Sequence, residues 1–235
     1  MIHILIGCND TVWATRMRAV IESTGSSVTS ALAVSGQVSS CQDTVHPRLK
    51  QVLCRYLKTD WLQSYHSPTV DNFRRLVNLS DFSAGQSFIL DSGCGTGKST
   101  LALARQFPEH LVIGVDRSAT RLAKSSLEHS LVRRGNCVLI RAELATFWRL
   151  LLVAAYLPER HFLFYPNPWP KPKHLQRRWH GHPVFPQLLA LGGEIELRCN
   201  WEIYAREFAH AVSIATGYDV QAQQLQNVTD RKSVV

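Results

Sequence analysis

The chain is predicted to adopt an α/β fold with a mostly parallel sheet and helices on both faces. After residue 87, short apolar runs alternate with amphipathic stretches, which is typical of strands joined by crossover helices. A glycine-rich turn follows the first apolar run directly. The chain has 235 residues, of which 45% are apolar, so it can bury one sizeable core.

The spacing of apolar residues predicts each element in order. Strands are expected at about 87–91, 111–116, 136–141, 160–166 and 193–199. Helices are expected near 98–107, 119–132, 143–156, 183–191 and 201–216. Ahead of the sheet, 47–57 and 69–79 also have helical spacing.

Three regions are expected along the chain. Residues 1–45 are rich in Ser, Thr, Val and Gly without periodicity and are predicted to be a poorly ordered leader. Residues 46–85 are predicted to form a helical extension, and 86–235 the α/β domain. A final strand is expected to begin within Tyr218–Gln226, and the C-terminal hairpin is expected to be incomplete.

Composition limits the partners and the compartment. Lys and Arg total 26 against 18 acidic residues, a net charge of +8, which favours a polyanionic partner such as nucleic acid. Six cysteines lie without C-x-x-C pairs, which indicates reduced cytoplasmic thiols and no metal site. The apolar run Leu150–Leu157 is far shorter than the roughly 20 residues that span a bilayer, so no membrane association is expected.

The segment Phe88–Thr100, FILDSGCGTGKST, predicts a pocket for a nucleotide-like cofactor. Its glycines, Gly93, Gly95 and Gly97, let the backbone approach a ligand and adopt positive φ. A phosphate-binding P-loop is the competing interpretation, but its first glycine would fall on Ser92. An ATPase is therefore disfavoured.

Acidic residues follow three successive predicted strands. Asp91 precedes the glycines in the order D-x-G-x-G-x-G, as in S-adenosylmethionine-dependent methyltransferases, and a carboxylate suits a cationic cofactor better than a triphosphate. Asp116, nineteen residues after Gly97, is placed to accept ribose hydroxyls, although it could instead cap a helix. Glu143 could accept the adenine amino group or simply start a helix.

A proline-rich loop and a basic stretch follow the fourth strand. Pro166-Asn167-Pro168-Trp169-Pro170 would hold Asn167 and Trp169 stiffly, and a tryptophan face stacks on bases with about 1–3 kcal/mol each. No acid occurs from Arg160 to Gly193, which favours phosphate contacts. The expected nucleic-acid contacts in this stretch are Trp169, Lys171, Lys173, His174, Arg177 and Arg178.

At these residues the chain resembles a known family. FYPNPWPKPKHLQRRW is similar to the F-P-D-P-W-P-K-K-R-H-x-K-R-R motif of bacterial tRNA (guanine-N7-)-methyltransferases. Gly192–Leu197, followed by Cys199–Glu202 and Tyr204, resembles that family's G-G-x-l-x-l-x-T-D-x-x-x-Y. The resemblance covers roughly residues 45–217. It implies a Rossmann-like class I methyltransferase fold that uses S-adenosylmethionine to methylate a guanosine of tRNA.

The resemblance also implies roles for single residues. Asp91, Asp116 and Glu143 would hold S-adenosylmethionine, and Asn167 would border the methyl donor and the target base. Lys171, Asn200 and Tyr204 would lie on the tRNA side. The chain has Asn167 and Asn200 where the family pattern has aspartates.

These departures leave the chemistry open. Guanine N7 has a lone pair and no proton, so alignment with the methyl group could supply much of the acceleration without a general base. A carboxylate would stabilise the cationic product, and Asn167 lacks that charge. Weak turnover, RNA binding without turnover, and methylation of an exocyclic amine remain alternatives. The oligomeric state is open, with a monomer favoured.

Overall fold

The computed structural model describes residues 2–8, 15–21, 38–80, 82–124 and 130–224. The chain divides into two compact units. The sheet unit comprises Leu62–Phe164 and Gln187–Ile195 together with residues 229–235, which lie outside the described part. The loop unit comprises Met1–Trp61, Tyr165–Pro186 and Glu196–Val228.

The sheet unit is built on five strands in the order β7-β3-β4-β6-β5. They are β3 (Phe88–Ser92), β4 (Leu111–Asp116), β5 (Leu131–Arg134), β6 (Cys137–Arg141) and β7 (Arg160–Phe164). β3 pairs in parallel with β4 and β7, and β4 pairs in parallel with β6, whereas β5 is antiparallel to β6. The α/β class predicted from the sequence is confirmed.

The register of these strands brings the acidic residues to one edge. Asp91 on β3 is opposite Gly114 on β4, and Asp116 at the end of β4 is opposite Arg141 at the end of β6. Because parallel strands all end at the same edge, both aspartates lie at the carboxyl edge of the sheet, where α/β proteins bind ligands.

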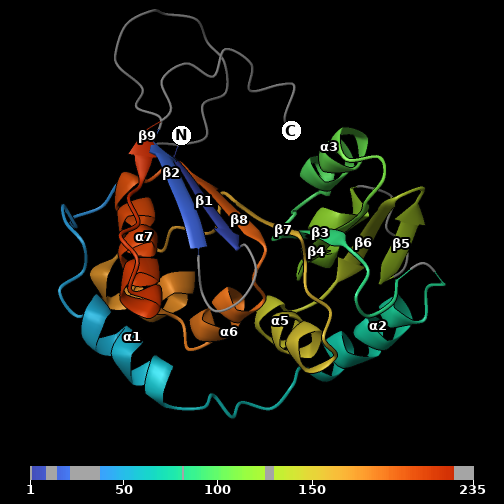
Figure 1. Ribbon diagram of the computed structural model, residues 1–235, viewed down its shortest axis with the longest axis horizontal. Coiled ribbons are helices and arrows are strands. Elements are labelled where there is room, and N and C mark those ends of the chain that lie inside the picture. Colours follow the sequence, from blue (N-terminus) through green and yellow to red (C-terminus); the bar gives the residue numbers. More distant parts are fainter. Residues whose placement is uncertain (1, 9–14, 22–37, 81, 125–129, 225–235) are drawn as a thin grey trace, which may run out of the picture. The chain divides into compact units, whose positions relative to one another are not determined.

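Helices cover both faces of this sheet (Figure 1). α3 (Lys98–Gln106) lies on one side, and α2 (Ser67–Val77) and α5 (Leu144–Val153) lie together on the other; α4 (Ala119–Ala123) follows β4. Phe73 of α2 meets Phe147 of α5 edge to face, with ring centroids 5.7 Å apart. α6 (Phe185–Ala190) spans a boundary between the units.

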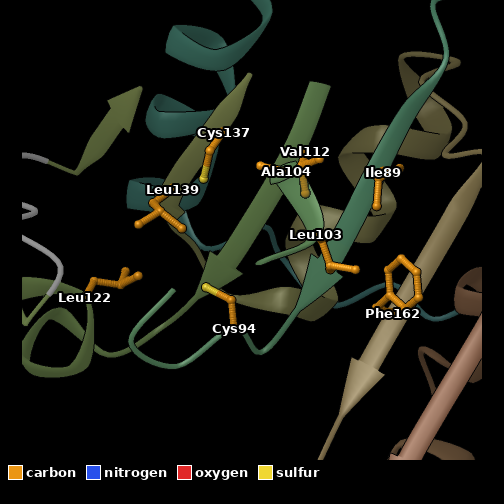
Figure 2. Packing of buried hydrophobic residues seen from close by; sticks show 9 residues of the cluster. All are labelled: Ile89, Cys94, Leu103, Ala104, Val112, Leu122, Cys137, Leu139 and Phe162. Carbon is orange, nitrogen blue, oxygen red and sulfur yellow. The ribbon is translucent and has the colours of Figure 1, made fainter. Parts of the chain in front are cut away.

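The core under α3 joins apolar residues of adjacent strands to apolar residues of α3 itself. Both β3 and β4 are buried at every position, as expected for central parallel strands. Figure 2 shows Ile89, Val112 and Leu139 of three adjacent strands with Leu103 of α3. This packing holds the start of α3 against the sheet, where the glycine turn enters it.

The five strands predicted between 87 and 199 and most of the helices are confirmed within two residues, but β5 was missed. The predicted helix 119–132 ends early, because α4 stops at Ala123 and Leu131–Arg134 forms a strand. Gly135, with φ of +58°, and Asn136 make a two-residue connection to β6. Gly-Asn between apolar runs is a hairpin signal that the sequence carried.

The loop unit contains the remaining elements. Its helices are α1 (Leu49–Lys58) and α7 (Glu202–Thr216), with short 3-10 helices at η1 (Pro172–Arg177) and η2 (Trp179–Gly181). Its strands are β1 (Ile2–Cys8), β2 (Thr15–Ile21), β9 (Gln223–Gln224) and β8 (Glu194–Cys199), whose first two residues belong to the sheet unit. β1 pairs antiparallel with β2 and with β9.

The assignment of residues 1–45 to a poorly ordered leader stays a prediction, although parts of this segment are described. Two of its segments, β1 and β2, pair over seven residues, and Ser40 and Gln42 make hydrogen bonds described below. The expected C-terminal hairpin falls after residue 224, outside the described residues. The domain boundaries at 45 and 85 stay predictions.

Three absences apply to the described residues alone. No helix there is long and apolar enough to cross a membrane. No group of His, Cys, Asp and Glu among them could hold a metal ion. Free thiols are found at Cys41, Cys54, Cys94, Cys137 and Cys199.

Replacing Gly114 on β4 is expected to loosen the support of α3. An alanine Cβ at Gly114 would overlap the Thr100 hydroxyl and lie 2.8 Å from Leu139 Cδ2. We expect Gly114→Ala to lower the free energy of unfolding by about 1–3 kcal/mol or more through overpacking. Chemical denaturation measures this.

Gly192→Ala is the control, because its Cβ would meet nothing within 4 Å and only its φ of +68° is strained. It should cost roughly 1–2 kcal/mol. A Gly114→Ala protein as stable as the wild type would contradict this packing.

Candidate functional site

The carboxylate of Asp91 is the central group of the site in the sheet unit. Asp91 has no exposed surface. Its Oδ2 accepts hydrogen bonds from Ser99 Oγ and Thr100 Oγ1, both at 2.7 Å. Its Oδ1 is also buried and has no partner among the described residues. One oxygen is thus fixed by the start of α3, while the other is left for a ligand.

Burial raises the pKa of Asp91 to about 6. Hydrogen bonds from Ser99 and Thr100 oppose this rise, and the nearby charge of Asp116 adds to it. A buried carboxylate gains most from a partner of opposite charge, because desolvation has left it without water. The site therefore favours a ligand with a cationic group.

The glycine turn between β3 and α3 leaves room for that ligand. Gly93, Gly95 and Gly97 have φ of +80°, +60° and +76°, which confirms the predicted left-handed conformations. An added Cβ at Gly93 or Gly95 would meet nothing within 4 Å, so the space beside the turn is open. At Gly97 a Cβ would lie 2.7 Å from Leu139 Cδ1, so this glycine also serves packing.

Asp116 ties the turn to the next helix. Its Oδ2 accepts from the backbone N–H of Gly95 at 2.9 Å, and its Oδ1 accepts from the N–H of Ser118 at 2.7 Å. Arg121 approaches Oδ2 at 3.5 Å. A carboxylate has about four acceptor positions, so these bonds leave capacity for hydroxyl donors. The ribose role of Asp116 stays a prediction.

Glu143 starts a helix. It is the N-cap of α5, and its two carboxylate oxygens accept from the N–H groups of Ala145 and Thr146 at 3.0 and 2.7 Å. This arrangement is the ordinary capping role that was weighed for it. Contact with an adenine amino group stays a prediction.

A buried polar chain beneath the site was not predicted from the sequence. Ser92 Oγ lies 2.8 Å from His161 Nε2 and accepts from Trp148 Nε1 at 3.0 Å. Desolvation lowers the pKa of His161 to about 3, so this histidine is neutral. The one sign of it in the sequence was a histidine, His161, within an otherwise apolar predicted strand. These hydrogen bonds fix Ser92, the last residue of β3, directly after Asp91.

The proline-rich loop lies wholly in the loop unit and presents Asn167 to solvent. Asn167 is exposed and Trp169 is half-buried. The guanidinium of Arg177 lies over the Trp169 ring, 4.8 Å from its centroid, and His174 meets the ring edge to face at 5.5 Å. Trp169 is therefore a surface platform with one flanking cation.

The predicted RNA contacts divide into exposed and buried groups. Lys171, Lys173, Arg177 and Asn200 are exposed and His174 is partly exposed. Arg178 and Tyr204, in contrast, have 0% and 1% of their surface exposed. The prediction that these two contact RNA is wrong, because Arg178 is paired with Glu207 and the Tyr204 hydroxyl accepts from the N–H of Trp179. A run of basic residues in a sequence does not reveal which of them has a buried acidic partner on a helix elsewhere in the chain.

The titration of Asp91 should be visible in the stability of the protein. Its pKa is raised on folding, so its contribution to stability is complete below pH 3.8 and is lost as the pH rises through about 6. Asp91→Asn, which cannot ionise, is therefore expected to be more stable than the wild type at pH 8, by at most ~3 kcal/mol.

Thermal unfolding of both ligand-free proteins at pH 4 and pH 8 measures this difference. The comparison isolates the effect of Asp91, because the two proteins share every other titratable residue. A difference that does not grow with pH would contradict the raised pKa.

The chain is similar to known methyltransferases. The family described as "Putative methyltransferase" matches residues 85–234. The tRNA (guanine-N(7)-)-methyltransferase of Stutzerimonas stutzeri (strain A1501) is 30% identical over 175 residues, 72% of this chain and 71% of that protein. The enzyme of the same name from Ectopseudomonas mendocina (strain ymp) is 31% identical over 157 residues, 63% of this chain and 62% of that protein.

Among solved structures, the antibiotic-resistance methyltransferase Kmr aligns with a TM-score of 0.38 and 20% identity, over 54% of this chain and 63% of that one, a likeness too slight to bear on the site. The family match contains the glycine turn, both aspartates and the proline-rich loop. The chain has a Rossmann-like methyltransferase fold and belongs, as a divergent member, to the tRNA (guanine-N(7)-)-methyltransferase family.

Proposed function

We propose that this chain transfers a methyl group from S-adenosylmethionine to guanine N7 in tRNA, in the cytoplasm. The observation that carries the proposal is the buried Asp91 carboxylate with one unpartnered oxygen beside an open glycine turn. The names of the relatives support the substrate, since both are tRNA (guanine-N(7)-)-methyltransferases.

The donor set fits this cofactor. S-adenosylmethionine supplies a methyl group on a positively charged sulfur and also carries a cationic amino group. Oδ1 of Asp91 would accept a hydrogen bond from the amino group. Asp116 would accept hydrogen bonds from the ribose hydroxyls at the acceptor positions that its protein contacts leave open. Gly93 and Gly95 would let the backbone approach the ligand closely. Glu143 would border the adenine.

The loop unit would bind the nucleic acid. Lys171, Lys173 and Arg177 are exposed cations next to a half-buried tryptophan, the combination of phosphate contacts and a stacking surface that nucleic acids need. His174 stays mostly uncharged, because desolvation and the cations around it lower its pKa. It would therefore contribute ring packing against Trp169 and little charge.

Asn167 would lie beside the reacting base. Methylation at N7 leaves the guanine positively charged, and the amide oxygen of Asn167 can stabilise this charge only as a neutral acceptor. The reaction needs no proton removed from N7. We therefore assign catalysis mainly to alignment of the base, with a smaller electrostatic part.

Incubation of the protein with a labelled methyl donor and unmodified tRNA tests the proposal. Nucleoside mass spectrometry is expected to show 7-methylguanosine. The matched control is Asp91→Asn, which should lose most of the activity because the neutral amide cannot pair with the cationic cofactor. Methylation at another atom would contradict the assignment of N7, and binding of tRNA and cofactor without any methylated nucleoside would contradict the enzyme.

Asn167→Asp is expected to raise the rate of methyl transfer. A hydrogen bond to a charged group contributes about 1.5–3 kcal/mol against roughly 1 for a neutral pair, so the rate should rise by about 2- to 30-fold. Single-turnover kinetics measures the chemical step directly. Asn167→Ala serves as the control that removes the acceptor and should be slower than the wild type. An aspartate variant no faster than the wild type would contradict the charge argument.

A further inference from the structure

The backbone of the loop Tyr165–Lys171, called the motif loop below, is strained at two places. Tyr165 has φ of +50° and Trp169 has φ of +46°, in a region that bulky residues rarely adopt. Each such residue costs about 1–3 kcal/mol and persists only where its surroundings hold it. Three prolines between and after them restrict the loop further.

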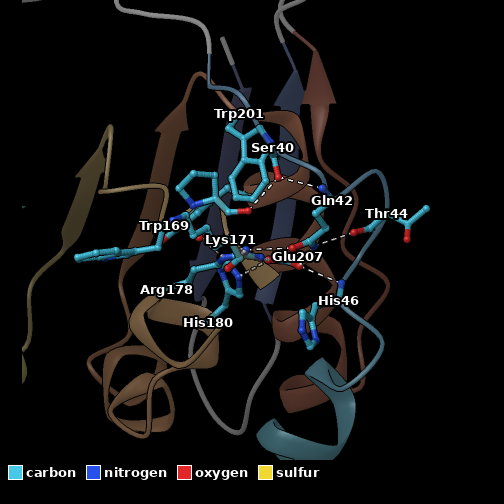
Figure 3. A network of polar contacts seen from close by, with 12 residues as sticks. Ser40, Gln42, Thr44, His46, Trp169, Lys171, Arg178, His180, Trp201 and Glu207 are labelled. Carbon is cyan, nitrogen blue, oxygen red and sulfur yellow. Dashed lines mark hydrogen bonds and ion pairs between the residues drawn. The ribbon is translucent and has the colours of Figure 1, made fainter. Parts of the chain in front are cut away.

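Arg178 is the group that holds the strained end. Its Nε and Nη2 both donate to the carbonyl oxygen of Trp169, at 3.2 and 3.1 Å, and Nη2 lies 3.4 Å from the carbonyl oxygen of Lys171. The buried guanidinium therefore acts on the strained residue itself (Figure 3).

Arg178 is in turn held from two distant parts of the loop unit. Nη1 donates to Glu207 of α7 at 2.5 Å, and Nη2 donates to the side-chain oxygen of Gln42 at 3.0 Å. The guanidinium also lies over the Trp201 ring, 4.8 Å from its centroid. Every one of these contacts is away from solvent, so the fork has one orientation.

Glu207 is fully engaged as well. It accepts from Gln42 Nε2 at 2.6 Å, from the N–H of His46 at 2.9 Å and from His180 at 2.8 Å. Burial by itself raises the pKa of Glu207, but the bonds and charges of His180 and Arg178 outweigh it and lower the pKa to about 2. The ion pair is therefore charged at neutral pH.

A second hydrogen bond fixes the loop independently of the ion pair. Ser40 Oγ donates to the carbonyl oxygen of Pro170 at 2.8 Å, and the N–H of Gln42 donates back to Ser40 Oγ at 3.0 Å. Residues 40–46 thus brace the motif loop from the N-terminal part of the chain. The side chains of Arg178 and Ser40 together hold three consecutive carbonyl oxygens, those of Trp169, Pro170 and Lys171.

We propose that Arg178, held by Glu207 and Gln42, is a positioning residue for methyl transfer, which sets the motif loop so that Asn167 and Trp169 present one geometry to the target base. This inference rests on the proposed function. A fully buried side chain cannot itself bind RNA, yet it controls the two residues of this loop that are placed to do so. Only a guanidinium can serve these acceptors at once, since a lysine ammonium lacks the planar fork.

Arg178→Lys tests this, with Arg206→Lys as the matched control. Arg206 makes an exposed pair with Glu202 on the same helix as Glu207. We expect Arg178→Lys to lower kcat by roughly 10- to 100-fold, because a misplacement of about 1 Å at a site can cost about that much. The Kd for tRNA should change by less than about threefold, since the exposed cations remain. The Kd for S-adenosylhomocysteine should be unchanged, and Arg206→Lys should match the wild type throughout.

Ser40→Ala keeps the test decisive if Arg178→Lys does not fold. It removes the second brace and leaves the ion pair, so kcat should fall several-fold while the melting temperature stays near that of the wild type. An equal rise of KM with unchanged kcat in both variants would overturn the inference, because the loop would then serve binding only. Unchanged kinetics in a folded variant would overturn it too.

Hydrogen exchange distinguishes this inference from the proposed function. In Arg178→Lys or Ser40→Ala, the amides of Asn167, Trp169 and Lys171 should exchange faster than in the wild type, with α1 unchanged. If the wild-type protein methylates no RNA, the proposed function fails, and exchange alone then decides whether the loop is held. Unchanged exchange would show that these residues do not position the loop.

Discussion

The burial of one carboxylate, that of Asp91, is the constraint on which the candidate site depends. The parallel register of β3 and β4 puts this group at the sheet edge, and α3 then supplies two hydroxyls to one of its oxygens. Protein hydrogen bonds thus satisfy Oδ2 of Asp91, while Oδ1 has no partner among the described residues. A carboxylate buried in this way is stabilised when a cationic ligand binds next to it. A site for a sulfonium cofactor needs this property.

The loop unit uses buried charge in the opposite way. Arg178 and Glu207 are paired with each other, and each also hydrogen-bonds to further protein groups, among them Gln42 for both, His180 for Glu207 and the carbonyl oxygen of Trp169 for Arg178. Such a pair adds little to stability compared with apolar packing of the same volume, but it specifies one arrangement. In this chain the arrangement that it specifies is the strained carbonyl of Trp169. Each unit thus orders its own candidate residues by its own internal contacts.

Asn167 marks the functional divergence of this chain within its family. Exposed on a stiff loop, it has the position and the freedom from competing contacts that a catalytic group needs, but an amide in place of a charge. In the proposed reaction this departure would weaken transition-state stabilisation and leave the alignment of the base intact. Several cations of the motif are kept, at Lys171, Lys173, Arg177 and Arg178, whereas Pro172 and Gln176 stand where the family pattern has lysines.

The sequence by itself determined the parallel sheet, the glycine turn and the acids at the strand ends. These features are local, because apolar runs, glycines and the residue after a strand are each readable from their neighbours. Only the tertiary structure decided which polar residues face solvent. Arg177 and Arg178 are adjacent in the sequence, yet one lies over Trp169 at the surface and the other has no exposed surface. The difference arises from Glu207 and Gln42, residues 29 and 136 positions away, and no local pattern encodes a partner that the fold brings from so far along the chain.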